Sequence, residues 1–358
     1  MAAERPILIC TRGSALALAQ ANQIAAQCRA AFPRLRFELK IIKTTGDKLQ
    51  KASMAKKGET LPKGLFTKEL EVALVKGQAD LAVHSLKDLP TDLPAGLVLA
   101  ATPRRADVRD VLIYRSADYI ANPENHLQEE WTPGQAALRG FKAHATLNDF
   151  PSGATIATSS TRRKEQLLAA RPDLNVVEIR GNVSTRMQKV AERAELDATV
   201  LALAGLTRLN FEIQEERGRP TREWMDARTS RPRSGRLMGD AVPDGLLATV
   251  LDLDVMLPCV GQGAIGIEIR AEDERIAKIV ERLNHFNTFQ AVTAERAFLQ
   301  GMGGGCQSPV AAYAEVDGEK ISMRAVSFRD PTMVKRAEGK RPVKEANLLG
   351  EELAAQLK

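Results

Sequence analysis

Arginine recurs at three places where a predicted strand gives way to a predicted helix. The turns are Thr11–Ser14, Thr158–Arg163, and Arg180–Asn182 followed by Arg186. Arginine in the first turn of a helix is unfavourable for the helix dipole, so two in a row at 162 and 163 need a reason. Bidentate binding of carboxylates or phosphates is one such reason. A capped helix with two solvated arginines explains the second turn about equally well.

The three junctions together favour a binding site. The carboxyl ends of parallel strands share one edge of a sheet, where ligands of open α/β sheets bind. A cleft built from such edges would collect a ligand with several negative charges. The sequence His84–Pro90 (HSLKDLP) also ends a buried strand. A Lys beside an Asp is usually a solvated pair, but at a strand end facing a cleft Asp88 could hold a developing cation or exchange a proton.

A fourth candidate is a thiol among glycines, in the loop Gly303–Gln307 (GGGCQ). A buried structural cysteine is the commonest alternative, but the glycines would also let a large group approach the sulfur of Cys306. No histidine lies nearby in sequence, so a protease-type thiol fits poorly. The remaining cysteines are Cys10, Cys28 and Cys259. Their wide spacing argues against a disulfide framework or a zinc site and favours a reducing, cytosolic setting.

Gly261–Gly266 matches the pattern G-x-G-x-x-G. A dinucleotide site needs a helix to open at those glycines, so that its N-terminus faces the pyrophosphate. Here the following residues alternate as in a strand, so we interpret the glycines as a crossing between domains. There is no P-loop motif, and the four histidines (84, 126, 144 and 285) lack ligand spacing, so no metal site is expected.

Composition narrows the class of protein. The chain has 358 residues and a net charge of +6, and 44% of its residues are hydrophobic. That length favours two or three domains. No apolar run suffices to span a membrane, and no secretory leader is expected at the N-terminus. Arg217–Arg236 contains seven arginines and two acids, or +5 of the net charge. With one Trp and interruptions by Pro and Gly, it favours a mobile insertion over a nucleic-acid-binding face.

Strands and helices alternate along the chain, which predicts parallel βαβ units. Strands are expected near residues 7–10, 37–41, 81–85, 110–114, 154–158, 175–179, 199–203, 265–269, 310–316 and 321–328. Helices are expected over residues 14–32 and 66–74, from about 162 and from about 185, and over 276–283, 288–300 and 344–357. Two polar stretches, about 116–150 and 210–245, are interpreted as insertions. The Lys- and Gly-rich segment Lys48–Lys63 is expected to be a loop.

Taken together, these motifs resemble the porphobilinogen deaminase (hydroxymethylbilane synthase) family. Nine segments match in the family's order: 11–20, 63–71, 84–91, 158–163, 178–186, 201–209, 260–268, 293–299 and 304–314. The resemblance implies two periplasmic-binding-protein-like α/β domains and a smaller α+β C-terminal domain. Domain 1 is expected at 1–104 with 263–284, domain 2 at 105–262 with both insertions, and domain 3 at 285–358 with Cys306. The insertions are longer than the family's usual pattern, and domain 3 is short.

The resemblance also implies an activity. Members join four porphobilinogen molecules head to tail, release ammonia, and free hydroxymethylbilane, a linear tetrapyrrole, by hydrolysis in porphyrin, heme and tetrapyrrole biosynthesis. The enzyme would be a transferase with one dipyrromethane cofactor per chain, bound by a thioether to Cys306. Asp88 would stabilise positive charge during the reaction as the catalytic residue. The cofactor would be held by Lys87, Asp88, Ser159, Arg162 and Arg163. Substrate carboxylates would face Arg12, Ser14, Gln20, Arg180, Arg186 and Arg208.

The remaining expectations rest on composition together with the resemblance. The protein should be a cytoplasmic monomer that binds no nucleic acid or membrane, and its product should pass to uroporphyrinogen-III synthase. Lys48–Lys63 would be a lid. The alternative is a clamshell polyanion-binding protein without catalysis, for which Cys306 and Asp88 would be dispensable. A second rival, an RNA-binding protein, rests on Arg217–Arg236 alone.

Overall fold

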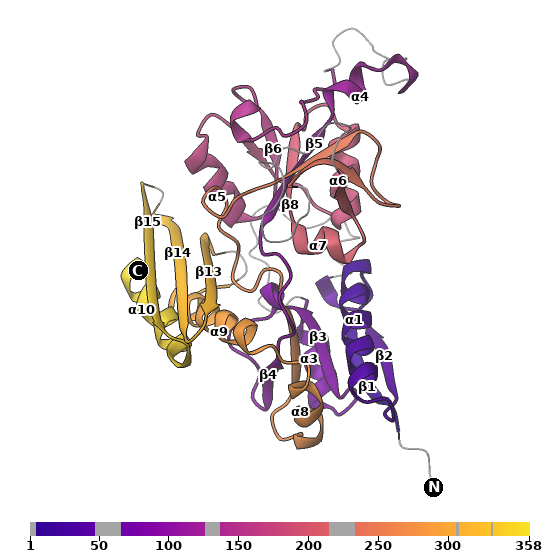
Figure 1. Ribbon diagram of the computed structural model, residues 1–358, viewed down its shortest axis with the longest axis vertical. Coiled ribbons are helices and arrows are strands. Elements are labelled where there is room, and N and C mark those ends of the chain that lie inside the picture. Colours follow the sequence, from indigo (N-terminus) through magenta and orange to yellow (C-terminus); the bar gives the residue numbers. More distant parts are fainter. Residues whose placement is uncertain (1–4, 47–65, 126–136, 215–232, 306–307, 331) are drawn as a thin grey trace. The chain divides into compact units, whose positions relative to one another are not determined.

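The computed structural model describes residues 5–46, 66–125, 137–214, 233–305, 308–330 and 332–358 (Figure 1). The chain divides into two compact units. The first combines residues 1–107 with 258–358, and the second is the continuous segment 108–257. The first unit holds two sheets and the second holds one.

The first sheet carries the N-terminal motifs. Its strands are β1 (Ile7–Arg12), β2 (Phe37–Ile42), β3 (Leu81–Ser85), β4 (Leu97–Ala101) and β12 (Ile265–Arg270). Their order is β2-β1-β3-β12-β4. β1 runs parallel to both β2 and β3, as the βαβ pattern predicts, whereas β12 is antiparallel to β3 and β4. The carboxyl ends of β1 and β3 therefore share one edge.

Helices cover both faces of this sheet: α1 (Ala15–Ala31), α3 (Lys68–Val75) and α8 (Glu274–Glu281). Ile24 of α1 and Ile279 of α8 pack in one cluster with Ile9 of β1. Leu70 of α3 packs with Cys10 on the opposite face. The alternation of side chains along β1 explains this division, because successive residues of a strand face opposite sides of the sheet.

The second unit is built on a seven-stranded sheet. Its strands, in sheet order, are β7 (Asn175–Val177), β6 (Thr155–Ala157), β8 (Ala198–Ala202), β5 (Asp110–Arg115), β11 (Leu246–Val250), β10 (Ser234–Met238) and β9 (Glu212–Gln214). β6 is parallel to β7 and β8. The helices are α4 (Ala117–Ala121), α5 (Thr161–Ala170), α6 (Val183–Glu192) and α7 (Leu203–Arg208), with short 3₁₀ turns at Pro123–Asn125 and Leu147–Asp149.

The described part of segment 116–150 contributes to the core of this unit. Phe141 and Phe150 stack on each other with ring centroids 4.1 Å apart, and each meets Tyr114 edge to face. The hydroxyl of Tyr114 accepts a hydrogen bond from the Ala145 amide at 2.9 Å. In the second stretch, 210–245, the described residues include β9 and β10. Both stretches thus supply structure that their polar composition concealed.

The third sheet is antiparallel, with the order β13-β14-β15. Its strands are β13 (Val310–Asp317), β14 (Lys320–Asp330) and β15 (Met333–Pro342), and its helices are α9 (Phe286–Gly301) and α10 (Ala346–Leu357), preceded by a 3₁₀ turn at Val343–Glu345. Phe298 of α9 and Leu353 of α10 are buried with Met323 of β14. This is the smaller α+β element that was expected at the C-terminus.

A buried carboxylate joins the parts of the first unit. Glu295 of α9 accepts two hydrogen bonds from the Arg105 guanidinium, at 2.7 and 2.9 Å. It also accepts hydrogen bonds from the amides of Gly261 (2.8 Å) and Ala314 (2.9 Å). Since Arg105 also donates to the carbonyl of Gln262 at 2.8 Å, the two segments next to residues 108–257 are tied to each other and to α9.

The fold class is therefore confirmed as α/β sheets with a smaller α+β element. The strand expected directly after Gly261–Gly266 is present as β12, and it takes the place of the helix that a dinucleotide fingerprint requires. The three predicted domain boundaries remain predictions. Within the described residues, no helix combines the length and the apolar character that crossing a membrane demands.

Candidate functional site

In the first unit, two predicted site segments end neighbouring strands. Arg12 is the last residue of β1, and Lys87 and Asp88 lie in a 3₁₀ turn, Leu86–Asp88, directly after β3. The guanidinium of Arg12 lies over the ring of Phe66, 4.3 Å from its centroid. Ser14 caps α1 by accepting a hydrogen bond from the Ala17 amide at 3.3 Å. The structure therefore brings these side chains to one edge, as parallel pairing of β1 and β3 requires.

Gln20 connects α1 to the end of β3. Its side-chain oxygen accepts a hydrogen bond from the Ser85 hydroxyl at 3.0 Å. The side chain is buried, and its amide nitrogen has no hydrogen-bond partner among the residues that the structure describes. A buried donor without a partner is destabilising, so such groups often await a ligand or water. This nitrogen supports the prediction that Gln20 lies beside a binding site.

The carboxylate of Asp88 is accessible, while the backbone around it is fixed. Asp88 is half-buried, and within the described part of the chain no hydrogen bond or ion pair to its carboxylate is found. Its main chain, in contrast, is well held. Leu86 donates to the Ala264 carbonyl at 3.1 Å, and Leu89 donates back to Leu86 at 3.1 Å. A fixed carboxylate with free acceptor positions suits the binding of N–H groups or of positive charge.

In the second unit, another group of predicted residues follows β6, β7 and β8. Ser159, after β6, donates to the Ile179 carbonyl at 2.5 Å and accepts from the Ile179 amide at 3.2 Å. These two bonds join the turn after β6 to the end of β7. Ser160 and Asn182 cap the helices that follow, so both arginine-bearing turns open onto helix N-termini.

Arg162 and Arg163 are both buried and share one carboxylate. Each forms an ion pair with Asp110, at 2.8 and 2.7 Å respectively. Arg162 also donates to the Leu257 carbonyl at 2.7 Å, and Arg163 donates to the Val200 carbonyl at 2.8 Å. Burial by itself would raise the pKa of Asp110, but the two guanidinium charges outweigh it and lower that pKa to about 2. Two cations against one anion leave this edge with a net positive charge.

Two further arginines add to that charge. Burial and, to a smaller extent, the charge of Arg163 lower the pKa of Arg186 to about 10. Burial also lowers the pKa of Arg208 to about 10. Both stay protonated at neutral pH, although partial loss of water makes the charge unfavourable. A carboxylate ligand would relieve that penalty. Arg180 instead is exposed and lies 3.5 Å from Glu178.

Cys306 lies outside the described residues, and so does Lys48–Lys63. Of the described residues on either side of it, Ser308 donates from its amide to the Gly305 carbonyl at 2.9 Å. A Cβ atom on Gly304 would lie 2.3 Å from the Leu299 side chain, so that position requires glycine. Burial raises the pKa of Cys10 to about 12 and that of Cys28 to about 11. Neither of these thiols is suited to form the nucleophilic thiolate.

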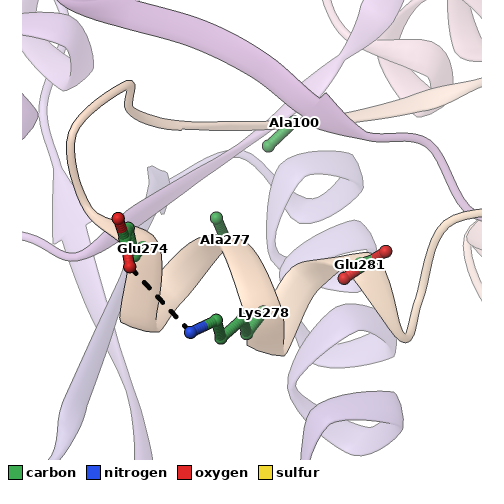
Figure 2. Close-up of a pocket in the computed structure, with 5 residues that line it drawn as sticks. All are labelled: Ala100, Glu274, Ala277, Lys278 and Glu281. Carbon is green, nitrogen blue, oxygen red and sulfur yellow. Dashed lines mark ion pairs between the residues drawn. The ribbon is translucent and has the colours of Figure 1, made fainter.

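A surface hollow elsewhere on the first unit does not fit an anionic ligand (Figure 2). It lies against α8 and is lined by Ala100, Glu274, Ala277, Lys278 and Glu281. Figure 2 shows Lys278 reaching back toward Glu274, and their charged atoms are 3.9 Å apart. The lining carries more negative than positive charge and contains none of the predicted site residues.

Sequence reasoning missed the partners that hold the site. Asp110 begins an apolar strand, and a lone acid there was the only signal of its pairing with arginines. Glu295 and Arg296 stand side by side in an otherwise apolar helix segment, TAERAFL, and this pair of opposite charges could have marked them. Arg296 donates to the carbonyls that directly follow Asp88.

Comparison with known proteins gives consistent matches over most of the chain. Residues 7–278 match the family model "Porphobilinogen deaminase, dipyromethane cofactor binding domain", and residues 289–358 match "Porphobilinogen deaminase, C-terminal domain". The porphobilinogen deaminase of Syntrophomonas wolfei is 39% identical over 90% of this chain and 85% of its own length. That of Syntrophus aciditrophicus is 40% identical over 97% of this chain and 93% of its own length.

Among solved structures, the chain is similar to the periplasmic aliphatic sulphonate binding protein SsuA from Escherichia coli. The match has 12% identity and a TM-score of 0.34, and it covers 84% of this chain and 71% of that protein.

Proposed function

Because the chain belongs to the porphobilinogen deaminase family, an enzyme family of tetrapyrrole biosynthesis, we propose that it joins four porphobilinogen molecules into hydroxymethylbilane with release of ammonia. The match of one family model to residues 7–278 is the observation that carries this proposal, because it spans both groups of predicted site residues. A binding protein without catalysis is not favoured by these matches.

The residues described above fit the family's dipyrromethane cofactor. The carboxylate of Asp88, which has no partner in the described part of the chain, can accept hydrogen bonds from pyrrole N–H groups. Lys87 beside it can pair with a carboxylate side arm. In the second unit, Ser159, Arg162 and Arg163 offer a net positive charge at a helix N-terminus, which also favours carboxylates. When bound, the dipyrromethane supplies the pyrrole end onto which substrate rings are added. Cys306 is the proposed point of attachment.

The charge of the chain matches its proposed substrate. Each porphobilinogen carries one acetate and one propionate, so each added ring brings two more carboxylates. Arg186 and Arg208 are protonated yet partly shielded from water, and they would gain most from pairing with those groups. Arg12, Ser14, Gln20 and Arg180 are the other proposed contacts for incoming substrate. Bidentate pairing explains why the chain uses arginine here in preference to lysine.

Asp88 has the proposed catalytic role. Loss of ammonia from porphobilinogen leaves positive charge on the pyrrole ring, and the attacking carbon must then release a proton. A fixed carboxylate beside the pyrrole nitrogens stabilises that charge without reorganisation. The 3₁₀ turn fixes the backbone at Asp88, and its oxygens have no competing partner among the described residues.

Intact-mass measurement tests the cofactor and its attachment together. The purified protein should exceed its sequence mass by one dipyrrole, and Cys306→Ala should abolish the excess. Cys259→Ala is the matched control, because Cys259 is half-exposed and should leave the added mass in place. A wild-type chain of unmodified mass that forms no linear tetrapyrrole from porphobilinogen would contradict the proposal.

The proposal also covers the location, the oligomeric state and the partner enzyme of the protein. We propose a cytoplasmic monomer that binds neither nucleic acid nor membrane, and we propose that its product is passed to uroporphyrinogen-III synthase. The chemistry supports the last step, because an open-chain product needs a second enzyme to close the ring. Light scattering of the purified chain at micromolar concentration tests the monomer, and a dimer mass would contradict it.

A further inference from the structure

Helix α9 contacts the chain directly behind the Asp88 turn. The guanidinium of Arg296 donates hydrogen bonds to three successive carbonyls, those of Leu89 (3.1 Å), Pro90 (2.6 Å) and Thr91 (3.3 Å). Pro90 restricts its own backbone angle, and the bonds from Arg296 fix the carbonyls on either side of it. The segment that leaves Asp88 is therefore attached to a long helix of the same unit.

The same face of α9 also packs on the turn itself. Val292 lies one helical turn before Arg296, so the two side chains share a face. Val292 is buried in a cluster with Leu86 and Leu89, which bracket Lys87 and Asp88. On another side, the backbone of Gly261 passes so close that a Cβ there would lie 3.2 Å from the Lys87 amide. The turn is thus held by apolar contact and by hydrogen bonds.

The surroundings of Arg296 indicate that it binds backbone carbonyls and not an acidic side chain. Burial lowers its pKa, while the more distant charges of Glu268 and Asp92 raise it. In the described part of the chain, no carboxylate comes within ion-pair distance of its guanidinium. A largely buried cation would normally be paired with an acid. Here its hydrogen-bonding capacity is directed at the three carbonyls instead.

We propose that Arg296 is a positioning residue that fixes the backbone at Leu89–Thr91 and thereby the direction in which Asp88 points. The proposal rests on the catalytic role proposed for Asp88. A planar guanidinium donates from two nitrogens in a fixed geometry, whereas a lysine ammonium is a single point that cannot hold three carbonyls in register. Small displacements of a reacting group lower rates strongly, so a loosened turn should reduce turnover more than substrate binding.

The test compares three variants of the full-length, cofactor-loaded chain. Arg296→Met keeps the aliphatic stem and removes the donors, and Arg296→Lys keeps the charge and removes the planar fork. Gln300→Met is the matched control. Gln300 is one turn further along α9 and donates to Asp92 at 2.8 Å, at the exposed end of the same loop.

Three quantities are measured for each variant: hydrogen exchange of residues 86–92, covalently bound dipyrrole per chain by intact mass, and kcat with KM. For Arg296→Met we expect exchange in residues 86–92 to rise about tenfold while that of α9 is unchanged. We expect kcat to fall about 10–100-fold with KM changed less than about threefold, since only orientation is lost. Arg296→Lys should give kcat and exchange rates between those of the wild type and of Arg296→Met. Gln300→Met should match the wild type in both.

An Asp88→Asn chain separates the two proposals. If Arg296 acts through Asp88, Arg296→Met should lower kcat little further when Asp88 is already Asn. Normal kcat or unchanged exchange in Arg296→Met, alongside a slow Asp88→Asn chain, overturns the role of Arg296 alone. Normal turnover in Asp88→Asn overturns the role proposed for Asp88 itself. If Arg296→Met does not fold, Arg296→Lys is judged by the same criteria.

Discussion

Asp110 and Asp88 differ in burial and in the partners of their carboxylates. Asp110 is fully buried between two arginines, and its pKa is lowered to about 2, so it is a permanent anion of the interior. Asp88 is half-buried at a strand end, and its carboxylate has no partner among the described residues. The first can only support the structure around it, whereas the second keeps its acceptor capacity for a ligand.

Asp88→Asn should therefore impair turnover while leaving binding largely intact. The amide has the same shape but lacks the negative charge that stabilises the positively charged ring. We expect kcat to fall at least about 100-fold, in the range seen when one preorganised electrostatic group is lost. The measurement is the rate of hydroxymethylbilane formation, with porphobilinogen binding followed separately. Asp92→Asn, four residues away and exposed, should retain normal turnover. Equal rates in both variants would end the catalytic assignment.

Asp110→Asn should destabilise the protein because two buried guanidinium groups lose their counter-charge. Breaking a buried pair by removing one partner costs about 3–5 kcal/mol at neutral pH. The folded-state pKa of Asp110 lies below its ordinary value of 3.8, so its contribution is present above pH 4 and is lost as the pH falls toward 2. The difference in unfolding free energy between wild type and variant should shrink across that window.

Urea unfolding between pH 2 and pH 7 measures this difference. Asp173→Asn is the control, because Asp173 also pairs with an arginine but lies at the surface, so its removal should change stability far less. A pH-independent difference between wild type and Asp110→Asn would show that the carboxylate charge is not what stabilises the two arginines.

The arginines of the candidate site could be predicted from the sequence, but their ion-pair partner could not. Arg162 and Arg163 stand out because a cation in the first turn of a helix needs an explanation. Their partner Asp110 lies about fifty residues earlier, on β5. It comes close to the arginines that follow β6 because β5 and β6 both pair with β8. The site residues were therefore recognisable from local pattern, whereas their ion pairs depend on tertiary structure.

At the scale of elements, the segment before β12 illustrates a requirement for glycine. Gly261 has a φ of +72°, and an added Cβ would lie 3.2 Å from the backbone of Leu86 and Lys87. Gly261→Ala should lower stability both through the left-handed conformation, about 1–2 kcal/mol, and through this contact. Gly318→Ala is the matched control, since Gly318 has a φ of +57° but open space around it.

Urea unfolding of both glycine variants separates strain from crowding. The loss in Gly318→Ala reports the backbone conformation alone, and any excess in Gly261→Ala reports the close approach to the Asp88 turn. We expect that excess to be accompanied by lower kcat, because the same turn carries Asp88. Equal losses of stability and normal kcat would mean that the turn tolerates the added methyl group.

Periodicity located most of the regular elements. Strand β3 has the predicted bounds, and α1 differs from its prediction by one residue at each end. β15 (Met333–Pro342) was missed because its sequence, MVKRAEGKRP, is charged and lies at the edge of its sheet, so it shows no apolar alternation. The aromatic packing of Phe141 and Phe150 was missed for a different reason, because isolated aromatic residues in a polar stretch carry no period.

At the scale of the whole molecule, one of the two compact units is formed by a single continuous segment of the chain. Residues 108–257 are continuous, whereas the other unit is assembled from both ends of the chain. The continuous unit has two large apolar clusters among its described residues, one on each face of its sheet. One includes Tyr114 and Leu167, and the other includes Ile113 and Met187. A segment with a complete core has what it needs to fold alone.

We therefore expect residues 108–257 to fold as an isolated fragment. Both ends are tied within the fragment, since Leu257 bonds to Arg162 and to Gln166, and the Leu203 amide donates to the Arg109 carbonyl at 3.0 Å. Far-ultraviolet circular dichroism should show mixed α/β structure and one cooperative urea transition. Asp110→Asn should destabilise the fragment as much as the full chain, because Asp110 and both of its arginines lie inside it. A fragment without a cooperative transition, or one indifferent to Asp110→Asn, would mean that this half of the chain depends on the other half for its structure.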